Sequence, residues 1–213
     1  MQVTKYEHAC LLIEEQGQRI IIDPGIFSGS ALHETRNIRA IVVTHIHPDH
    51  FDPDKLSEIT HINPECTIYT TQEVKAQLAN SSVKAITAGD VVKTGPFKLE
   101  FFGVKHATIH SSLPVAQNTG VMVNDSLYYP GDSFTVPSKP VRVLALPAVA
   151  PWAKIAESID FMLALEPKVV FPTHNALLSK EGLGIYNRVL GNTAKSKNID
   201  YKYLEPGQHI TVN

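Results

Sequence analysis

Six residues of this chain, His45-x-His47-x-Asp49-His50, constrain its fold more than any other segment. They place three imidazoles and a carboxylate directly after the β-branched run Ile38–Thr44, which predicts a buried central strand. Protonated histidines packed this closely would repel one another, whereas neutral imidazoles and a carboxylate are ligands for divalent metal ions. The segment therefore predicts a sheet strand that carries a metal site at its carboxyl end.

Other polar groups follow predicted strands in the same way. These groups are Asp23 after Arg19–Ile22, His106 and His110 at and beyond the end of a predicted strand 97–105, Asp132 after Leu127–Tyr129, and His174 after Lys168–Phe171. Sites in open sheets lie beyond the carboxyl ends of strands. We therefore expect these side chains to meet the histidine cluster at one sheet edge.

The order of elements favours two sheets with helices outside them. Strands predominate in the first part of the chain, beginning with a hairpin whose turn contains Gly17, and strands later alternate with helices. The predicted helices begin at Pro53 with Asp52 as the N-cap, run from Thr70-Thr71-Gln72-Glu73 to about Ala79, and cover 153–165 and 180–197.

Composition limits the classes of protein to which the chain can belong. With 213 residues, 43% of them hydrophobic, it suits one domain over residues 1–213. A net charge of −2 argues against a nucleic-acid partner. The chain has no signal-peptide pattern and no apolar run of roughly 18–20 residues, so we expect no membrane span. Cys10 and Cys66 lie in strand-like runs, which favours buried thiols and a cytoplasmic location.

Together these residues resemble the motifs of the metallo-β-lactamase superfamily. Asp23, the histidine cluster, His106, Asp132 and His174 follow the order of those motifs over nearly the whole chain. The wider sequence, with HATIHSSLPVAQNTG, YYPGDSF, LPAVAPW and PTHN, is similar to a bacterial subgroup near the ascorbate-6-phosphate lactonase-like proteins. The resemblance implies a four-layer αββα sandwich of two mixed sheets flanked by helices. It also implies a metal-dependent hydrolase that acts on a small soluble substrate.

The resemblance further implies a site for two divalent ions. His45, His47 and His106 would hold one ion, Asp49, His50 and His174 would hold the other, and Asp132 would bridge them. Asp23 would orient the histidine loop without touching a metal. The nitrogen and oxygen ligands suit Zn²⁺ and also admit Mn²⁺ or Fe. With Asp49 and Asp132 at the ions, a metal-bound hydroxide would attack a lactone, another ester or amide, or a phosphodiester.

Several assignments have alternatives at this point. Either His106 or His110 is the third histidine ligand; we take His106 as the ligand and His110 as a catalytic pocket residue that relays protons or binds a substrate anion. Four further residues are expected beside the site or in its pocket: His8, Asn118, Trp152 and Asn175. Ordinary structural roles compete with this: His8 as a strand residue, Trp152 as core and Asp23 as part of an Asp-Pro-Gly turn.

The function also has rivals. A catalytically degenerate member of the fold that only binds a metal or ligand is one, and a mononuclear iron oxidoreductase on the same scaffold is another. The sequence does not decide the oligomeric state, and a homo-oligomer stays open.

Overall fold

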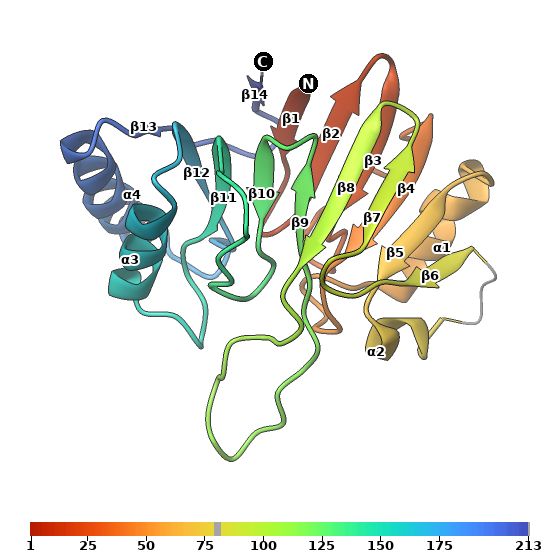
Figure 1. Cartoon of the computed structure of the whole chain (residues 1–213), viewed down its shortest axis with the longest axis horizontal. Coiled ribbons are helices and arrows are strands. Elements are labelled where there is room, and N and C mark those ends of the chain that lie inside the picture. The colour runs from red at the N-terminus through yellow and green to blue at the C-terminus, as the bar shows by residue number, and fades with distance from the viewer. Residues whose placement is uncertain (79–81, 213) are drawn as a thin grey trace.

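Alternating apolar residues build the first of two seven-stranded sheets in the computed structural model, which describes residues 1–78 and 82–212 (Figure 1). Its strand order is β14-β1-β2-β3-β4-β5-β6. The strands are β1 (Gln2–Lys5), β2 (Leu11–Glu15), β3 (Gln18–Ile22), β4 (Ile38–Val43), β5 (Thr67–Thr70), β6 (Val83–Ala85) and β14 (His209–Thr211). Strands β14 to β3 pair antiparallel and β3 to β6 pair parallel, so the sheet is mixed.

The second sheet has the order β13-β12-β11-β10-β9-β8-β7. Its strands are β7 (Val91–Thr94), β8 (Phe97–Phe102), β9 (Gly120–Val123), β10 (Leu127–Tyr129), β11 (Val143–Pro147), β12 (Val169–Thr173) and β13 (Asp200–Tyr201). Strands β7 to β10 pair antiparallel and β10 to β13 pair parallel. This sheet is mixed as well.

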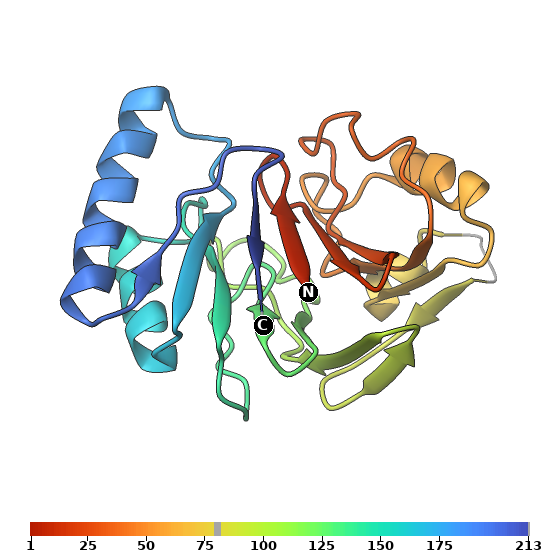
Figure 2. The same cartoon turned by 90° about the horizontal axis from the view of Figure 1, so that it is seen from above.

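The two sheets share one core and each has a second core on its outer face. Side chains alternate between faces along a strand, so Ile20 and Ile22 enter the core between the sheets while Ile21 packs outside with α1 (Pro53–Ile62). The short helix α2 (Gln72–Lys75) lies beside β6. On the outer face of the second sheet, Leu144 and Leu146 pack with α3 (Ile155–Leu165) and α4 (Lys180–Ser196) (Figure 2). The predicted αββα arrangement is confirmed.

Strand direction brings the polar loops to one edge. Strands β3 and β4 run parallel, and β8, β10, β11 and β12 all run in one direction in the second sheet. The long loop after β8 extends beyond this edge at the bottom of Figure 1. The carboxyl ends of these strands therefore form the site edge.

Some local predictions hold and others are wrong. Asp52 caps α1, its Oδ1 accepting from the N–H groups of Asp54 and Lys55 at 3.1 and 3.2 Å. The helix predicted from Thr70 is a single turn capped by Thr71, and its expected end at Ala79 lies outside the described residues. The strand predicted over 97–105 ends at Phe102, because Gly103 turns the chain at a φ of +78°. Within the described residues, no helix combines the length and apolar character needed to cross a membrane.

Candidate metal centre

The histidine loop follows β4 and turns tightly against the loop after β3. Backbone N–H groups of His50 and Phe51 both donate to the His47 carbonyl, at 3.0 and 2.9 Å. Gly25 packs directly on this turn: a Cβ at Gly25 would lie 2.1 Å from the carbonyl carbon of Asp49. Only glycine permits this approach, so the two loops fix the position of Asp49 together.

A first group of potential ligands consists of His45, His47 and His106. Their ligand atoms lie within 4.8 Å of one another. The ring centroids are 4.8 Å apart for His45 and His47, and 4.6 Å for His47 and His106. This is the set that the sequence predicts for one ion.

A second group contains Asp49, His50 and His174, again within 4.8 Å, with His8 as a fourth member. The Nε2 atoms of His174 and His50 lie 3.2 and 3.7 Å from Asp49 Oδ2. These are the three residues predicted for the other ion, and His8 is an addition to them.

The Asp132 carboxylate lies between the two groups. Its Oδ2 is 3.4 Å from Nε2 of His106 and 3.9 Å from Nε2 of His45 in the first group. Towards the second group, Oδ2 is 3.1 Å from Nε2 of His174 and Oδ1 is 3.2 Å from Nε2 of His50. Asp132 thus reaches both groups, as a bridging ligand must.

Two predicted neighbours hold Asp132 in place, one through its backbone and one through its carboxylate. The Asn118 side-chain oxygen accepts from the Asp132 N–H at 3.0 Å, and its amide donates to the Pro130 carbonyl at 2.9 Å. Trp152 Nε1 donates to Asp132 Oδ2 at 2.8 Å, and its ring packs edge-on against His106. Asn118 and Trp152 therefore have direct roles at the site, whereas Asn175 is simply buried beside His174 in the same loop.

Six buried side-chain polar atoms have no hydrogen-bond partner among the described residues; one is Thr173 Oγ1, and the other five belong to the two groups or to Asp132. These five are Nε2 of His45, His50, His106 and His174, and Oδ1 of Asp132. Each buried polar atom without a partner costs about 1–3 kcal/mol. Because imidazole nitrogens and a carboxylate are good metal ligands, the donor set fits divalent cations.

The other ring nitrogen of each of these four histidines is fixed by an acceptor. The Nδ1 contacts are His50 to Asp23 Oδ2, His106 to the Ala107 carbonyl, His174 to the Val149 carbonyl, and His45 to Thr44 Oγ1. Carboxylates and carbonyls only accept, and the Thr44 hydroxyl already donates to Asp23 Oδ2 at 2.6 Å. In the neutral form of each ring the proton is therefore on Nδ1, which leaves Nε2 with a free lone pair for a metal ion.

Asp23 is fully buried at the base of the histidine loop. Its Oδ1 accepts from the Thr44 N–H at 2.7 Å, and its Oδ2 accepts from the Thr44 hydroxyl and from His50 Nδ1, both at 2.6 Å. Although Asp23 also lies close to His45 and His50, both of its oxygens are already occupied by these donors. The geometry suits the orienting role expected for it.

His8 contacts Asp49, a member of the second group. The Ala176 N–H donates to His8 Nδ1 at 3.3 Å, so the ring proton is on Nε2, which donates to Asp49 Oδ2 at 3.0 Å. The His8 ring also lies 3.9 Å from that of His174. Burial lowers the pKa of His8, which favours this neutral donor.

The structure separates the two candidates for the third histidine. His106 is buried in the first group, whereas His110 is exposed in the long loop and hydrogen-bonds Ser112. The pocket role expected of His110 therefore lacks support from its position. Sequence reasoning missed Thr44 and Tyr129, whose hydroxyl lies 3.5 Å from His50 Nδ1. Thr44 could have been noticed as the polar end of an apolar strand; no signal pointed to Tyr129.

Comparison with known proteins identifies the family. A family model, the β-lactamase superfamily domain, matches residues 2–174. This chain belongs to the β-lactamase superfamily. Protein Rv0786c of Mycobacterium tuberculosis is 35% identical over 99% of this chain and 100% of its own length.

Other relatives within the superfamily carry a functional name. A UPF0173 metal-dependent hydrolase of Aeropyrum pernix is 26% identical over 62% of this chain and 61% of its own length. Igni18, a metallo hydrolase from Ignicoccus hospitalis, superposes with a TM-score of 0.75 at 18% identity, over 100% of this chain and 98% of that chain. This superfamily member is therefore related to metal-dependent hydrolases, and its structural likeness shows their fold.

The carboxylates of this superfamily member favour positive charge at the centre. Burial alone would lower the pKa of His174, but the nearby Asp132 raises it to about 9. His50 is raised well above its ordinary pKa by Asp132 and Asp23, again against the effect of burial. Burial raises the pKa of a carboxyl group, yet His50 and His174 hold the pKa of Asp132 well below its usual range. Cations, whether protons or metal ions, are stabilised here.

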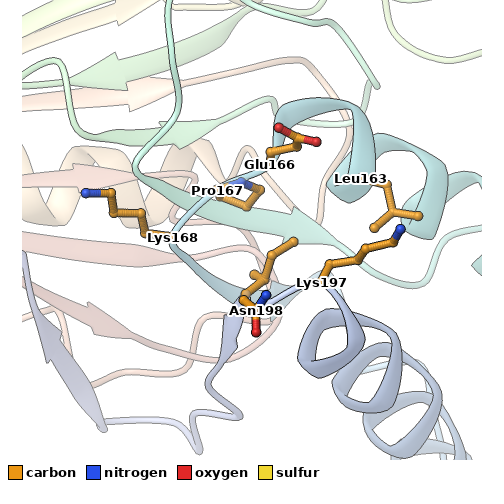
Figure 3. Close-up of a pocket in the computed structure, with 7 residues that line it drawn as sticks. Leu163, Glu166, Pro167, Lys168, Lys197 and Asn198 are labelled. Carbon is orange, nitrogen blue, oxygen red and sulfur yellow. The ribbon is translucent and has the colours of Figure 1, made fainter.

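A separate hollow of about 410 Å³ lies between the ends of α3 and α4, shown in Figure 3. Lys168 precedes β12, so this hollow is at the sheet edge opposite His174. Figure 3 shows the side chains of Lys168 and Lys197 pointing in different directions. Their charges do not converge on one ligand, and the metal centre remains the candidate functional site.

Proposed function

We propose that this superfamily member is a hydrolase with two divalent metal ions, Zn²⁺ being the first candidate and Mn²⁺ or Fe the others. The observation that carries the proposal is the set of buried, partnerless Nε2 atoms whose histidines are all protonated on Nδ1. His45, His47 and His106 would hold one ion and Asp49, His50 and His174 the other. Asp132 would bridge them and offset their mutual repulsion.

Bound ions would supply a hydroxide at neutral pH and would polarise the oxygen of the scissile group. The chain's own residues place and protect this chemistry. Trp152 donates to the Asp132 carboxylate, Asn118 accepts from the Asp132 backbone N–H, and His8 donates to the Asp49 carboxylate. Cys10 and Cys66 are buried, and burial raises the pKa of both thiols, so neither serves as a nucleophile. These features favour attack by a metal-bound hydroxide.

The substrate class stays open at this level. A lactone, another ester or amide, or a phosphodiester would suit the centre, and the likeness to ascorbate-6-phosphate lactonase-like proteins stays a prediction. So do the cytoplasmic location and a homo-oligomer.

The test is a reconstitution experiment. The chain would be stripped with a chelator, reloaded with Zn²⁺, Mn²⁺ or Fe²⁺, and screened on lactones, carboxylic esters, thioesters and phosphodiesters. We expect hydrolysis that depends on metal and is lost, together with metal content, in His47→Ala and Asp132→Ala. His209→Ala, at an exposed position of β14, is the matched control and should keep both.

Other outcomes would overturn the proposal. One iron per chain with oxygen consumption would support the oxidoreductase, and a chain that binds no metal would support the degenerate member. Full metal content and activity in Asp132→Ala would refute the ligand assignment.

A further inference from the structure

We infer that the substrate is electrically neutral and carries an apolar group, which binds against the loops at the site edge; this rests on the proposed hydrolytic function. Such a substrate narrows the classes of scissile bond considered above. The favoured class is a lactone, ester or amide with a hydrocarbon substituent, and a phosphorylated compound is disfavoured.

The first observation is the composition of the loops around the centre. Five of the loops that follow strands ending at the site edge each contain a stretch without Asp, Glu, Lys or Arg: residues 24–33, 106–119, 133–138, 148–153 and 174–179. The charged residues of these loops lie outside the stretches: Asp23, Glu34, Arg36, Lys105, Asp132, Lys139, Arg142 and Lys154. Charged residues make up 19% of the whole chain, so five uncharged stretches at one edge are a marked departure. The charged groups at this edge are mainly the carboxylates of the histidine loop and Asp132.

Nearby lysines do not supply the missing positive charge. Lys55 is buried and its ammonium group donates to the Gly25 carbonyl and to Ser28 Oγ at 2.7 and 2.8 Å. Lys105 pairs with Gln117 next to His106 in an extended segment, where successive side chains point to opposite sides. Proteins bind phosphate groups with Arg, Lys or helix N-termini. The five stretches contain no such cation; the exposed Lys154 follows one of them. The first turns of α1, α3 and α4 carry Asp54, Glu157 and Glu181, which disfavour an anion at these helix N-termini.

The second observation is where the protein exposes large apolar side chains. Seven of the ten that the described residues expose lie on four of these same loops: Ile26, Phe27, Ile109, Leu113, Val115, Val136 and Leu177. Their exposed fractions run from 40% for Ile109 to 59% for Val136. Exposed apolar side chains that gather in one region mark binding sites rather than ordinary surface.

Short contacts connect residues of these loops to His8 and to the histidine loop. The Phe27 ring packs edge-on against His8 with centroids 5.3 Å apart, and His8 donates to Asp49. The Ile26 N–H donates to the Pro48 carbonyl in the histidine loop at 2.9 Å. Leu177 follows Ala176, whose N–H donates to His8. The apolar side chains on this flank are therefore continuous with the second ion group.

The other flank is formed by the long loop after β8. It runs from Gly103 to Thr119 and extends beyond the sheet edge (Figure 1). The His106 N–H donates to the Ala116 carbonyl at 3.0 Å, and the exposed Ile109, Leu113 and Val115 lie between these two residues in the sequence. Among the proposed ligands, His47 is half-buried and the Asp49 side chain is 22% exposed, so solvent reaches the centre at these two. Because these loops carry or contact the proposed ligands, we assign their apolar side chains to the substrate rather than to a partner protein.

The test uses the metal-loaded enzyme and a series of neutral p-nitrophenyl esters from acetate to octanoate, with alkyl-substituted γ-lactones as a second series. Burying each added methylene should raise kcat/KM about threefold to fourfold until the apolar surface is filled. Bis(p-nitrophenyl) phosphate is the anionic comparison, and we expect its kcat/KM to fall below that of the longer esters.

Variants locate the effect. Leu113→Ser and Leu177→Ser should each reduce kcat/KM for the octanoate ester about threefold to tenfold, a larger loss than for the acetate ester, at wild-type metal content. Ile185→Ser is the matched control, because Ile185 is 52% exposed on α4, outside the site loops. It should leave the whole series unchanged.

The outcomes separate this inference from the proposed function. A flat chain-length series, or preferred turnover of phosphorylated substrates, would overturn the inference and leave a metal-dependent hydrolase in place. No hydrolysis of any substrate at full metal content would overturn both. If light scattering shows that Leu113→Ser or Leu177→Ser converts an oligomer to monomers without changing the chain-length series, the apolar side chains form an interface between copies and the inference is wrong.

Discussion

Replacing Asp23 with asparagine tests the proposed control of His50, because the change keeps the shape of the side chain and alters its hydrogen bonds. The amide oxygen can still accept from the Thr44 N–H, which puts the amide nitrogen where Oδ2 now accepts from the Thr44 hydroxyl and from His50 Nδ1. The new amide N–H and the Nδ1–H of His50, both hydrogen-bond donors, would then face each other. We expect the His50 proton to move to Nε2, the atom directed at Asp132, and the ligand lone pair to be lost.

The size of the effect follows from this geometry. Removing the hydrogen-bond partner of a metal-binding histidine costs about tenfold to 100-fold in metal affinity, or about 1.4–2.8 kcal/mol. The opposite amide orientation sets its nitrogen against the buried Thr44 N–H, which costs about 1–3 kcal/mol of stability instead. His45 should keep its tautomer, since the Thr44 oxygen has two lone pairs. The loss should therefore fall on one ion.

The assay is a titration of the metal-free protein with Zn²⁺ against a competing chelator, accompanied by urea unfolding of the same protein. Asp23→Asn should show one site near the wild-type affinity and one weakened site. Asp125→Asn is the control, since Asp125 lies in an exposed turn at a φ of +49°, which asparagine tolerates. Two sites of wild-type affinity in Asp23→Asn, with unchanged stability, would refute the reasoning.

Two further predictions concern the scaffold. Gly25→Ala should lower the free energy of unfolding by about 2 kcal/mol or more and weaken metal binding, because its Cβ would lie 2.1 Å from the Asp49 backbone. The control is Gly184→Ala on α4, where a Cβ would enter open space, and it should instead stabilise the chain by about 1 kcal/mol. Urea unfolding of both variants checks this, and equal effects would contradict it. Burial lowers the pKa of Lys5 in the folded chain to about 8, whereas the pKa of an unfolded lysine is about 10.4. Between pH 8 and that value the unfolded chain binds more protons than the folded chain, so the free energy of unfolding should rise with pH across this window by up to about 3 kcal/mol. Lys5→Met should remove that rise in urea titrations at pH 7 and pH 10, and a persistent rise would exclude Lys5 as its source.

The sequence was sufficient for the layers and for most of the proposed ligands, for a physical reason. Each predicted ligand except His106 directly follows a strand whose apolar pattern is unambiguous, and parallel strands bring their carboxyl ends to one edge. The exception arose because the strand from Phe97 was expected to reach Lys105. The turn at Gly103 depends on a backbone conformation that the sequence does not specify, so His106 and His110 could not be separated.

Other features depend on contacts between distant parts of the chain. The role of His8 requires the Ala176 N–H, 168 residues away, which fixes the proton on Nε2. The Nδ1 contact of His174 is likewise made by the Val149 carbonyl, 25 residues earlier. Such tautomers follow from tertiary structure, and no local pattern encodes them.

The central claim is that the two groups hold one divalent ion each, and anomalous diffraction from crystals of the zinc-loaded protein tests it most directly. The account predicts two zinc peaks per chain. One should lie among His45, His47 and His106, the other among Asp49, His50 and His174, with Asp132 between them. A single peak at full zinc loading, or peaks away from these side chains, would contradict the account.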